Sequence, residues 1–148
     1  MTYSGRLIEY LDGGRFICGM VIENQSKRVH LINQNGREVN LPVSRIIHCS
    51  EHSYGSIADR EIVVGELKEA HERRSSLMRE INLEELWELV SEEEGASFDP
   101  AFLAELSFGA AATDDKVAAF LRCIFADRIF FKYREGVMTY RNGMHIHQ

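Results

Sequence analysis

The sequence predicts an α+β protein in which a small β-sheet module precedes a helical module. Over residues 3–50, short runs rich in Val, Ile, Phe and Tyr alternate with turn residues, which is typical of β-strands. From Asp59 onward, apolar residues recur every three to four positions, which is typical of amphipathic helices. The change of period near Asp59 therefore separates two kinds of structure.

The first 50 residues predict a small barrel. The expected strands cover residues 5–11, 15–23, 27–33, 37–41 and 45–50, with one helical turn over 42–45. The first two strands flank Gly13-Gly14, where glycine adopts a positive φ at no steric cost. Five short strands in so short a segment favour an SH3-like barrel, with an OB-like barrel as the second choice.

The third and fourth strands flank Asn35-Gly36, which predicts a two-residue type I′ hairpin. Such a turn pairs Ile32 with Val39. It also pairs His30 with Leu41, and it places all four side chains on one core face.

The second half predicts a long helix followed by three short helices and a hairpin. A helix over 59–81 has a narrow apolar stripe and a charged opposite face, which suits a connector. The short helices begin at three capping residues, Asn82, Asp99 and Thr113. Strands over 129–134 and 137–141 then form a hairpin, called the wing below.

Three short helices followed by a hairpin form a winged helix, a helix-turn-helix with a β-hairpin. We therefore expect three parts: a small β-barrel over residues 1–55, a connector helix over 56–81 and a winged-helix domain over 82–148.

Charge is distributed unevenly along the chain. The formal net charge is −6, but residues 1–55 carry six basic and five acidic groups and residues 113–148 carry six basic and four acidic groups. The acidic excess lies in residues 56–112, so a basic patch remains possible at each end. An apolar content of 45% excludes a disordered chain.

The sequence shows no pattern typical of a catalytic or metal site. Asp114-Asp115, the one Asp pair, lies where helix capping already explains it. The histidines and the three cysteines lack zinc-site spacing and a CxxC motif. Cys18, Cys123 and Trp87 are expected to be core residues. No apolar run is long enough to span a bilayer and no signal peptide is evident, so we expect a cytoplasmic protein without a membrane partner.

Binding is the function that the residues favour, through basic side chains interleaved with aromatic ones. Such a pattern suits contacts to a nucleic-acid backbone together with base stacking. The barrel aromatics are Tyr10 and Phe16, and the wing aromatics are Tyr133 and Tyr140. The candidate RNA-binding residues are Arg6, Arg15, Lys27, Arg28, Arg37 and Arg45 in the barrel and Lys132, Arg134 and Arg141 in the wing.

Several segments together resemble one branch of the ribonuclease II and ribonuclease R superfamily, the RNB exoribonucleases. The main one is Ile-Asn-Leu-Glu-Glu-Leu-Trp-Glu-Leu-Val over residues 81–90. The others are residues 5–10, residues 35–42 with Arg45, and the stretch from Leu121 to Tyr133.

The resemblance implies a division of labour. Enzymes of this superfamily degrade RNA hydrolytically from its 3′ end, with magnesium held by aspartates of the RNB domain. This chain stops at Gln148, about where that domain would begin. We therefore expect a non-catalytic N-terminal accessory fragment, with no cofactor of its own, whose partners are single-stranded RNA and the missing RNB domain.

Two other functions stay open. One is a winged-helix DNA-binding transcription regulator, whose third helix would offer base-reading side chains near its start. That helix instead begins with Asp114 and Asp115, and its expected outward positions are Lys116, Ala119, Arg122 and Ala126. The other is a protein-docking module.

Overall fold

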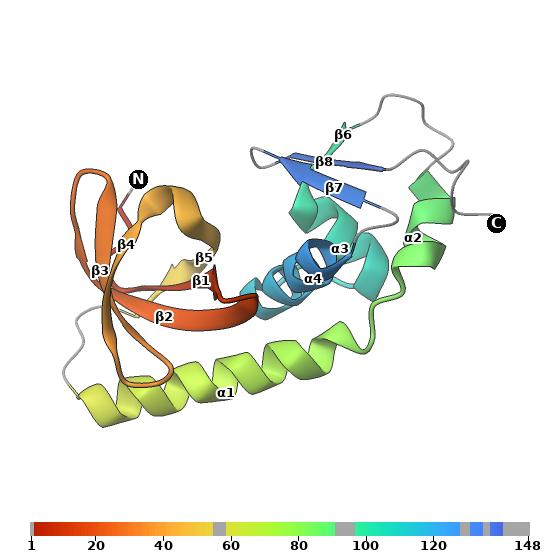
Figure 1. Cartoon of the computed structure of the whole chain (residues 1–148). Helices are drawn as coiled ribbons and strands as arrows, with labels where there is room; N and C mark the ends of the chain where they lie inside the picture. The colour runs from red at the N-terminus through yellow and green to blue at the C-terminus, as the bar shows by residue number, and fades with distance from the viewer. Residues whose placement is uncertain (1, 55–58, 91–96, 128–130, 135–136, 141–148) are drawn as a thin grey trace. The chain divides into compact units, whose positions relative to one another are not determined.

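The structure is a computed structural model that describes residues 2–54, 59–90, 97–127, 131–134 and 137–140 (Figure 1). The chain has the expected α+β organisation, with an antiparallel sheet in its N-terminal part and helices after it. It divides into two compact units, residues 1–73 and 74–148, and the boundary between them lies inside helix α1 (Arg60–Met78).

The first unit is built on a five-stranded antiparallel sheet with the order β4-β3-β2-β1-β5. Its strands are β1 (Arg6–Asp12), β2 (Arg15–Asn24), β3 (Arg28–Asn33), β4 (Glu38–Pro42) and β5 (Ile46–Ser53). A 3-10 turn, η1 (Val43–Arg45), joins β4 to β5 at the predicted helical turn. At the β1–β2 hairpin Asp12 pairs with Arg15, and Gly13 and Gly14 both have positive φ.

The expected SH3-like barrel is not closed. Within residues 2–54 the edge strands β4 and β5 pair only with β3 and β1. β4 is short and ends at Pro42, which has no N–H to extend a ladder, and η1 takes the chain out of the extended conformation. Val43 and Ile46 instead pack on the same core cluster as Leu41, so side chains rather than hydrogen bonds cover this opening.

The predicted register of the β3–β4 hairpin is wrong by one residue. Leu31 pairs with Val39, and Val29 pairs with Leu41. The N–H of Gly36 donates to the carbonyl of Asn33, and the N–H of Asn33 donates to the carbonyl of Arg37. Gly36 is therefore the left-handed residue, at φ 79°, of a three-residue loop rather than half of a type I′ turn.

The corrected register moves His30 out of the predicted core face. His30 now pairs with Asn40, and its Nε2 lies 2.8 Å from Oε1 of the exposed Glu38. This hydrogen bond lowers the pKa of Glu38 below its usual value. Arg60, at the start of α1, reaches the other oxygen of Glu38 at 3.4 Å.

Helix α1 covers the second face of the sheet. Its buried residues Val63, Leu67 and Ala70 pack against a cluster from β1, β2 and β3 that comprises Leu7, Cys18, Met20 and Ile32. The helix begins at Asp59, whose Oδ1 accepts the N–H groups of Glu61 and Ile62. Both faces of the sheet are thus buried. On one face the side chains of the curved strands pack against one another, and the other face is covered by α1.

The second unit has the predicted order of three helices and a hairpin. Its elements are α2 (Leu83–Val90), β6 (Ser97–Phe98), α3 (Pro100–Phe108), α4 (Asp114–Ala126), β7 (Phe131–Arg134) and β8 (Val137–Tyr140). The predicted caps are confirmed: the side chains of Asn82, Asp99 and Thr113 each accept a backbone N–H at the start of a helix. The strand order of its small sheet is β6-β8-β7.

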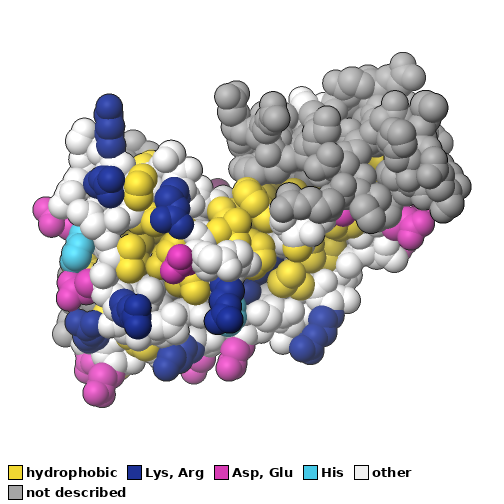
Figure 2. Space-filling model, in the orientation of Figure 1, with side chains coloured by type: hydrophobic (Ala, Val, Ile, Leu, Met, Phe, Trp, Pro, Cys, Tyr) yellow, Lys and Arg dark blue, Asp and Glu magenta, His cyan; other side chains and the backbone are white. Residues whose placement is uncertain are grey.

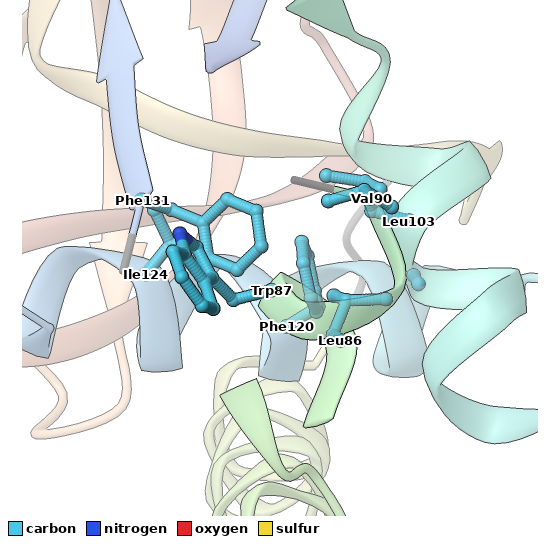
Figure 3. Packing of buried hydrophobic residues seen from close by; sticks show 8 residues of the cluster. Leu86, Trp87, Val90, Leu103, Phe120, Ile124 and Phe131 are labelled. Atoms are coloured by element: carbon cyan, nitrogen blue, oxygen red, sulfur yellow. The ribbon is translucent and has the colours of Figure 1, made fainter. Parts of the chain in front are cut away.

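One apolar cluster joins these elements (Figure 3). Trp87 of α2 lies among Phe120 and Ile124 of α4 and Phe131 of β7, and Leu103 of α3 belongs to the same cluster. Trp87 is 5% exposed, so its assignment to the core is confirmed.

We expect Leu67→Ala to destabilise the first unit by about 3 kcal/mol, because Leu67 is fully buried between α1 and the sheet. Ile62→Ala is the matched control: it removes similar volume from the same helix at a position that is 61% exposed, and should cost less than about 0.5 kcal/mol. Urea unfolding followed by circular dichroism measures both. Equal losses would contradict the packing of α1 on the sheet.

Candidate nucleic-acid interface

The basic residues predicted in the first unit do not form one patch. Arg15 lies at the β1–β2 turn and Arg37 in the β3–β4 loop, whereas Lys27 and Arg28 lie where β3 begins. The two ends of β3 are about 17 Å apart at 3.3 Å per residue. Figure 2 shows the Lys and Arg side chains of the visible face as single groups, separated by other surface.

Two of the predicted arginines donate hydrogen bonds to backbone carbonyl groups. Nη1 of Arg6 donates to the carbonyl of Ser50 at 3.1 Å, and Nη2 of Arg45 donates to the carbonyl of Leu11. Both contacts tie β1 to β5 or to the turn before it. These side chains therefore have a structural use that the sequence pattern does not reveal.

Tyr10 is not available for base stacking. It is 3% exposed, it belongs to the core cluster of the sheet, and its hydroxyl accepts a hydrogen bond from Nδ2 of Asn33 at 3.3 Å. Burial raises the pKa of Tyr10 above its ordinary value. The expectation that the ring of Tyr10 is exposed for base stacking among the barrel arginines is therefore wrong. Phe16, the other predicted barrel aromatic, is half-buried.

The wing candidates are described only by their backbone. Lys132 pairs with Thr139 and Arg134 pairs with Val137 in the β7–β8 ladder, which confirms the hairpin. Tyr133 pairs with Met138, whereas Arg141 lies outside the described residues.

Helix α4 offers few side chains that could read bases. Of its expected outward positions, Ala119 and Arg122 are buried, at 0% and 1% exposure. Nη1 of Arg122 donates to Oγ of Ser75 at 3.1 Å, and the ammonium of Lys116 lies 5.6 Å from the ring centre of Phe108. The basic groups of α4 are thus engaged with the protein, which argues against the transcription-regulator alternative.

Arg74 is a key residue that the sequence analysis did not identify. It is 1% exposed, and its Nε donates to Oδ1 of Asp115 at the start of α4, at 2.8 Å. The sequence does indicate that Arg74 is buried, because it continues the stripe of Val63, Leu67 and Ala70 at helical spacing. A charged residue on an apolar stripe indicates a buried partner.

An open groove of about 600 Å³ lies at the junction of α1, α2 and α4. Its lining residues are Met78–Glu84, Cys123, Ala126 and Asp127. Burial raises the pKa of the Cys123 thiol to about 11, so the thiol is protonated at neutral pH and is a poor nucleophile.

Over the described ranges, no group of three His, Cys, Asp or Glu side chains is placed to hold a metal ion. Nor does any helix described combine the length and apolarity needed to cross a bilayer.

Comparison with known families identifies the second unit. The model of the ribonuclease II winged helix domain matches residues 69–142, from the second half of α1 through β8. This is half of the chain. The chain belongs to the ribonuclease II family. The resemblance seen in residues 81–90 is thereby confirmed. No curated protein and no solved structure matches the chain, and the five-stranded sheet lies outside the matched region.

We expect Asp115→Asn to lower the free energy of unfolding of this ribonuclease II winged helix by about 3 kcal/mol, because it removes the carboxylate charge that faces the buried guanidinium of Arg74. Asp114→Asn is the matched control, since it removes a charge from the same helix turn and should cost about 0.5 kcal/mol. Trp87 fluorescence during urea unfolding reports both values. Equal changes for the two variants would refute a special role for the ion pair.

The Cys123 thiol should react slowly with iodoacetamide at pH 8, because a pKa of about 11 leaves about one thiol in a thousand ionised. Mass spectrometry locates the alkylated cysteine, and the urea-unfolded chain is the control. Alkylation at equal rates in the folded and unfolded chains would show that the groove exposes a reactive thiol.

Proposed function

We propose that this chain is a non-catalytic RNA-binding accessory region of a ribonuclease II-like 3′-to-5′ exoribonuclease. The observation that carries the proposal is the match to the ribonuclease II winged helix domain, which spans three helices and the wing hairpin around one core. The resemblance implies that such a domain accompanies a catalytic RNB domain in the same enzyme.

The aspartates of this chain support a non-catalytic role. Asp59 and Asp99 cap helices, and Asp115 pairs with the buried Arg74. Asp127 accepts the N–H of Phe131 through Oδ2 at 2.9 Å. Hydrolysis by a magnesium cluster needs several carboxylates that converge on the metal ions, whereas these are committed to separate structural contacts. The magnesium would belong to the RNB domain.

RNA contact would come mainly from exposed cations. Arg15 and Arg28 are exposed where β2 and β3 begin, and Arg37 is exposed in the β3–β4 loop. Each cation that neutralises a phosphate releases counterions, so binding through these side chains would be weak and sensitive to salt. We place this activity in the cytoplasm as part of the same proposal.

A protein-docking role is the second candidate, and one observation favours it. Phe102 and Leu106, one turn apart on α3, are 49% and 40% exposed, and Leu89 of α2 is 65% exposed. An exposed apolar surface of this kind suits packing against another domain. The two roles are compatible within one enzyme.

The purified chain, incubated with end-labelled single-stranded RNA and magnesium, should leave the RNA intact, because its aspartates do not form a metal cluster. The same preparation should bind that RNA in fluorescence anisotropy, with affinity falling as salt rises. Stepwise shortening from the 3′ end that co-purifies with the chain would overturn the non-catalytic assignment. Complete absence of binding would favour the docking role.

We expect the combined variant Arg15→Ala, Arg28→Ala and Arg37→Ala to bind RNA more weakly than the wild type. Three lost phosphate contacts should reduce the slope of log K against log salt by about 2, at about 0.7 per contact for a single strand. The comparison variant replaces Lys132, Arg134 and Arg141 by Ala. Loss of affinity in the wing variant alone would mean that the wing, not the sheet, contacts RNA.

A further inference from the structure

The pairing of strand β5 with β1 is irregular near the end of β5. Cys49 pairs with Ile8 and Ser53 pairs with Arg6, so four steps along β5 match two steps along β1. Three residues of β5, Ser50, Glu51 and His52, thus lie opposite the single residue Leu7 and form a bulge. Bulges of this kind redirect side chains away from the regular alternation of a strand, often beside a binding site.

Ser50 holds the bulge in one conformation. Its side chain is 2% exposed, and its Oγ accepts the N–H of Leu7 at 3.1 Å and donates to the carbonyl of His52 at 2.8 Å. The carbonyl of Ser50 accepts Nη1 of Arg6 at 3.1 Å. Three hydrogen bonds therefore fix a segment that regular pairing with β1 leaves out.

An exposed pair of rings lies at the bulge and just after it. His52 and Tyr54 lie edge to face, with ring centres 4.7 Å apart and an interplanar angle of 88°, and Tyr54 is 42% exposed. The backbone of Tyr54 is anchored as well, because its N–H donates to the carbonyl of Gly5 at 2.7 Å and the N–H of Gly5 donates to Val21. The rings are thus held by the sheet rather than by a loose loop.

One cationic side chain lies at this end of β5. Arg6 pairs with Ser53, and one of the five guanidinium donors is used on Ser50. Lys27 lies between β2 and β3 and Arg28 begins β3, and β2 is the strand to which Gly5 is bonded. Glu51 is exposed in the bulge itself and opposes a phosphate there, so the rings themselves suit a base rather than a phosphate.

We propose that His52 and Tyr54, with Arg6 beside them, form a base-stacking platform for single-stranded RNA. The proposal rests on the RNA-binding function proposed above and gives it a site. An anchored, exposed aromatic ring beside a cation is an arrangement that binds single strands without strong sequence preference, because every base has a stacking face. It also supplies the exposed aromatic group that the buried Tyr10 cannot provide.

The test compares variants of the full chain by anisotropy with a fluorescein-labelled uridine oligonucleotide. Tyr54→Ala should weaken binding about tenfold, the scale of one lost base stack. Tyr54→Phe keeps the ring and should stay within about twofold of the wild type. Ile22→Ala is the matched control, because Ile22 lies in the same sheet and is 43% exposed but offers no ring, and it should leave binding unchanged.

A second measurement uses the wild type and so does not depend on the folding of a variant. Ultraviolet crosslinking to the same RNA, followed by mass spectrometry of the peptides, should locate the crosslink in residues 50–54. The platform would be overturned, with RNA binding left intact, if the Tyr54→Ala variant bound RNA as tightly as the wild type. Crosslinks confined to other segments would have the same meaning. A wild type that does not bind would overturn both proposals.

Discussion

The buried stripe of helix α1 is the constraint on which much of the structure depends. In the first unit, Val63, Leu67 and Ala70 cover the face of the sheet that curvature leaves open. In the second unit, the same stripe continues as Arg74, and Ser75 follows it. These two side chains bind Asp115 and Arg122 of α4. In the first unit the buried residues of α1 thus meet an apolar sheet face, whereas in the second unit Arg74 and Ser75 make polar contacts with α4.

The engagement of α4 has a functional consequence. A winged helix that reads DNA presents the side chains of its third helix to base edges. Here Asp115 is committed to Arg74, Arg122 is buried, and Lys116 lies over Phe108. The fold of the ribonuclease II winged helix domain is retained while the charged residues of its third helix serve internal contacts. Our proposal therefore assigns RNA contact to the exposed cations and the bulged strand of the sheet.

Specific residues show where sequence patterns misled. Asn35-Gly36 permits both a two-residue and a three-residue loop, and the choice moves every side chain of β4 to the other face. The burial of Val29, Leu31, Val39 and Leu41 decides in favour of the longer loop. Arg6 and Arg45 resemble free surface cations in the sequence, yet carbonyl groups distant in the chain accept their hydrogen bonds. Long-range acceptors of this kind leave no local signal.

The sequence by itself determined the order of elements, the helix starts and the family, because these depend on period, capping residues and contiguous motifs. The caps at Asn82, Asp99 and Thr113 act within one helix turn and so could be predicted without a tertiary model. Only the tertiary structure decided the open sheet, the register of β4, the ion pair of Arg74 and the exposed rings of His52 and Tyr54. Each of these depends on which distant backbone or side chain completes a hydrogen bond or covers an apolar face.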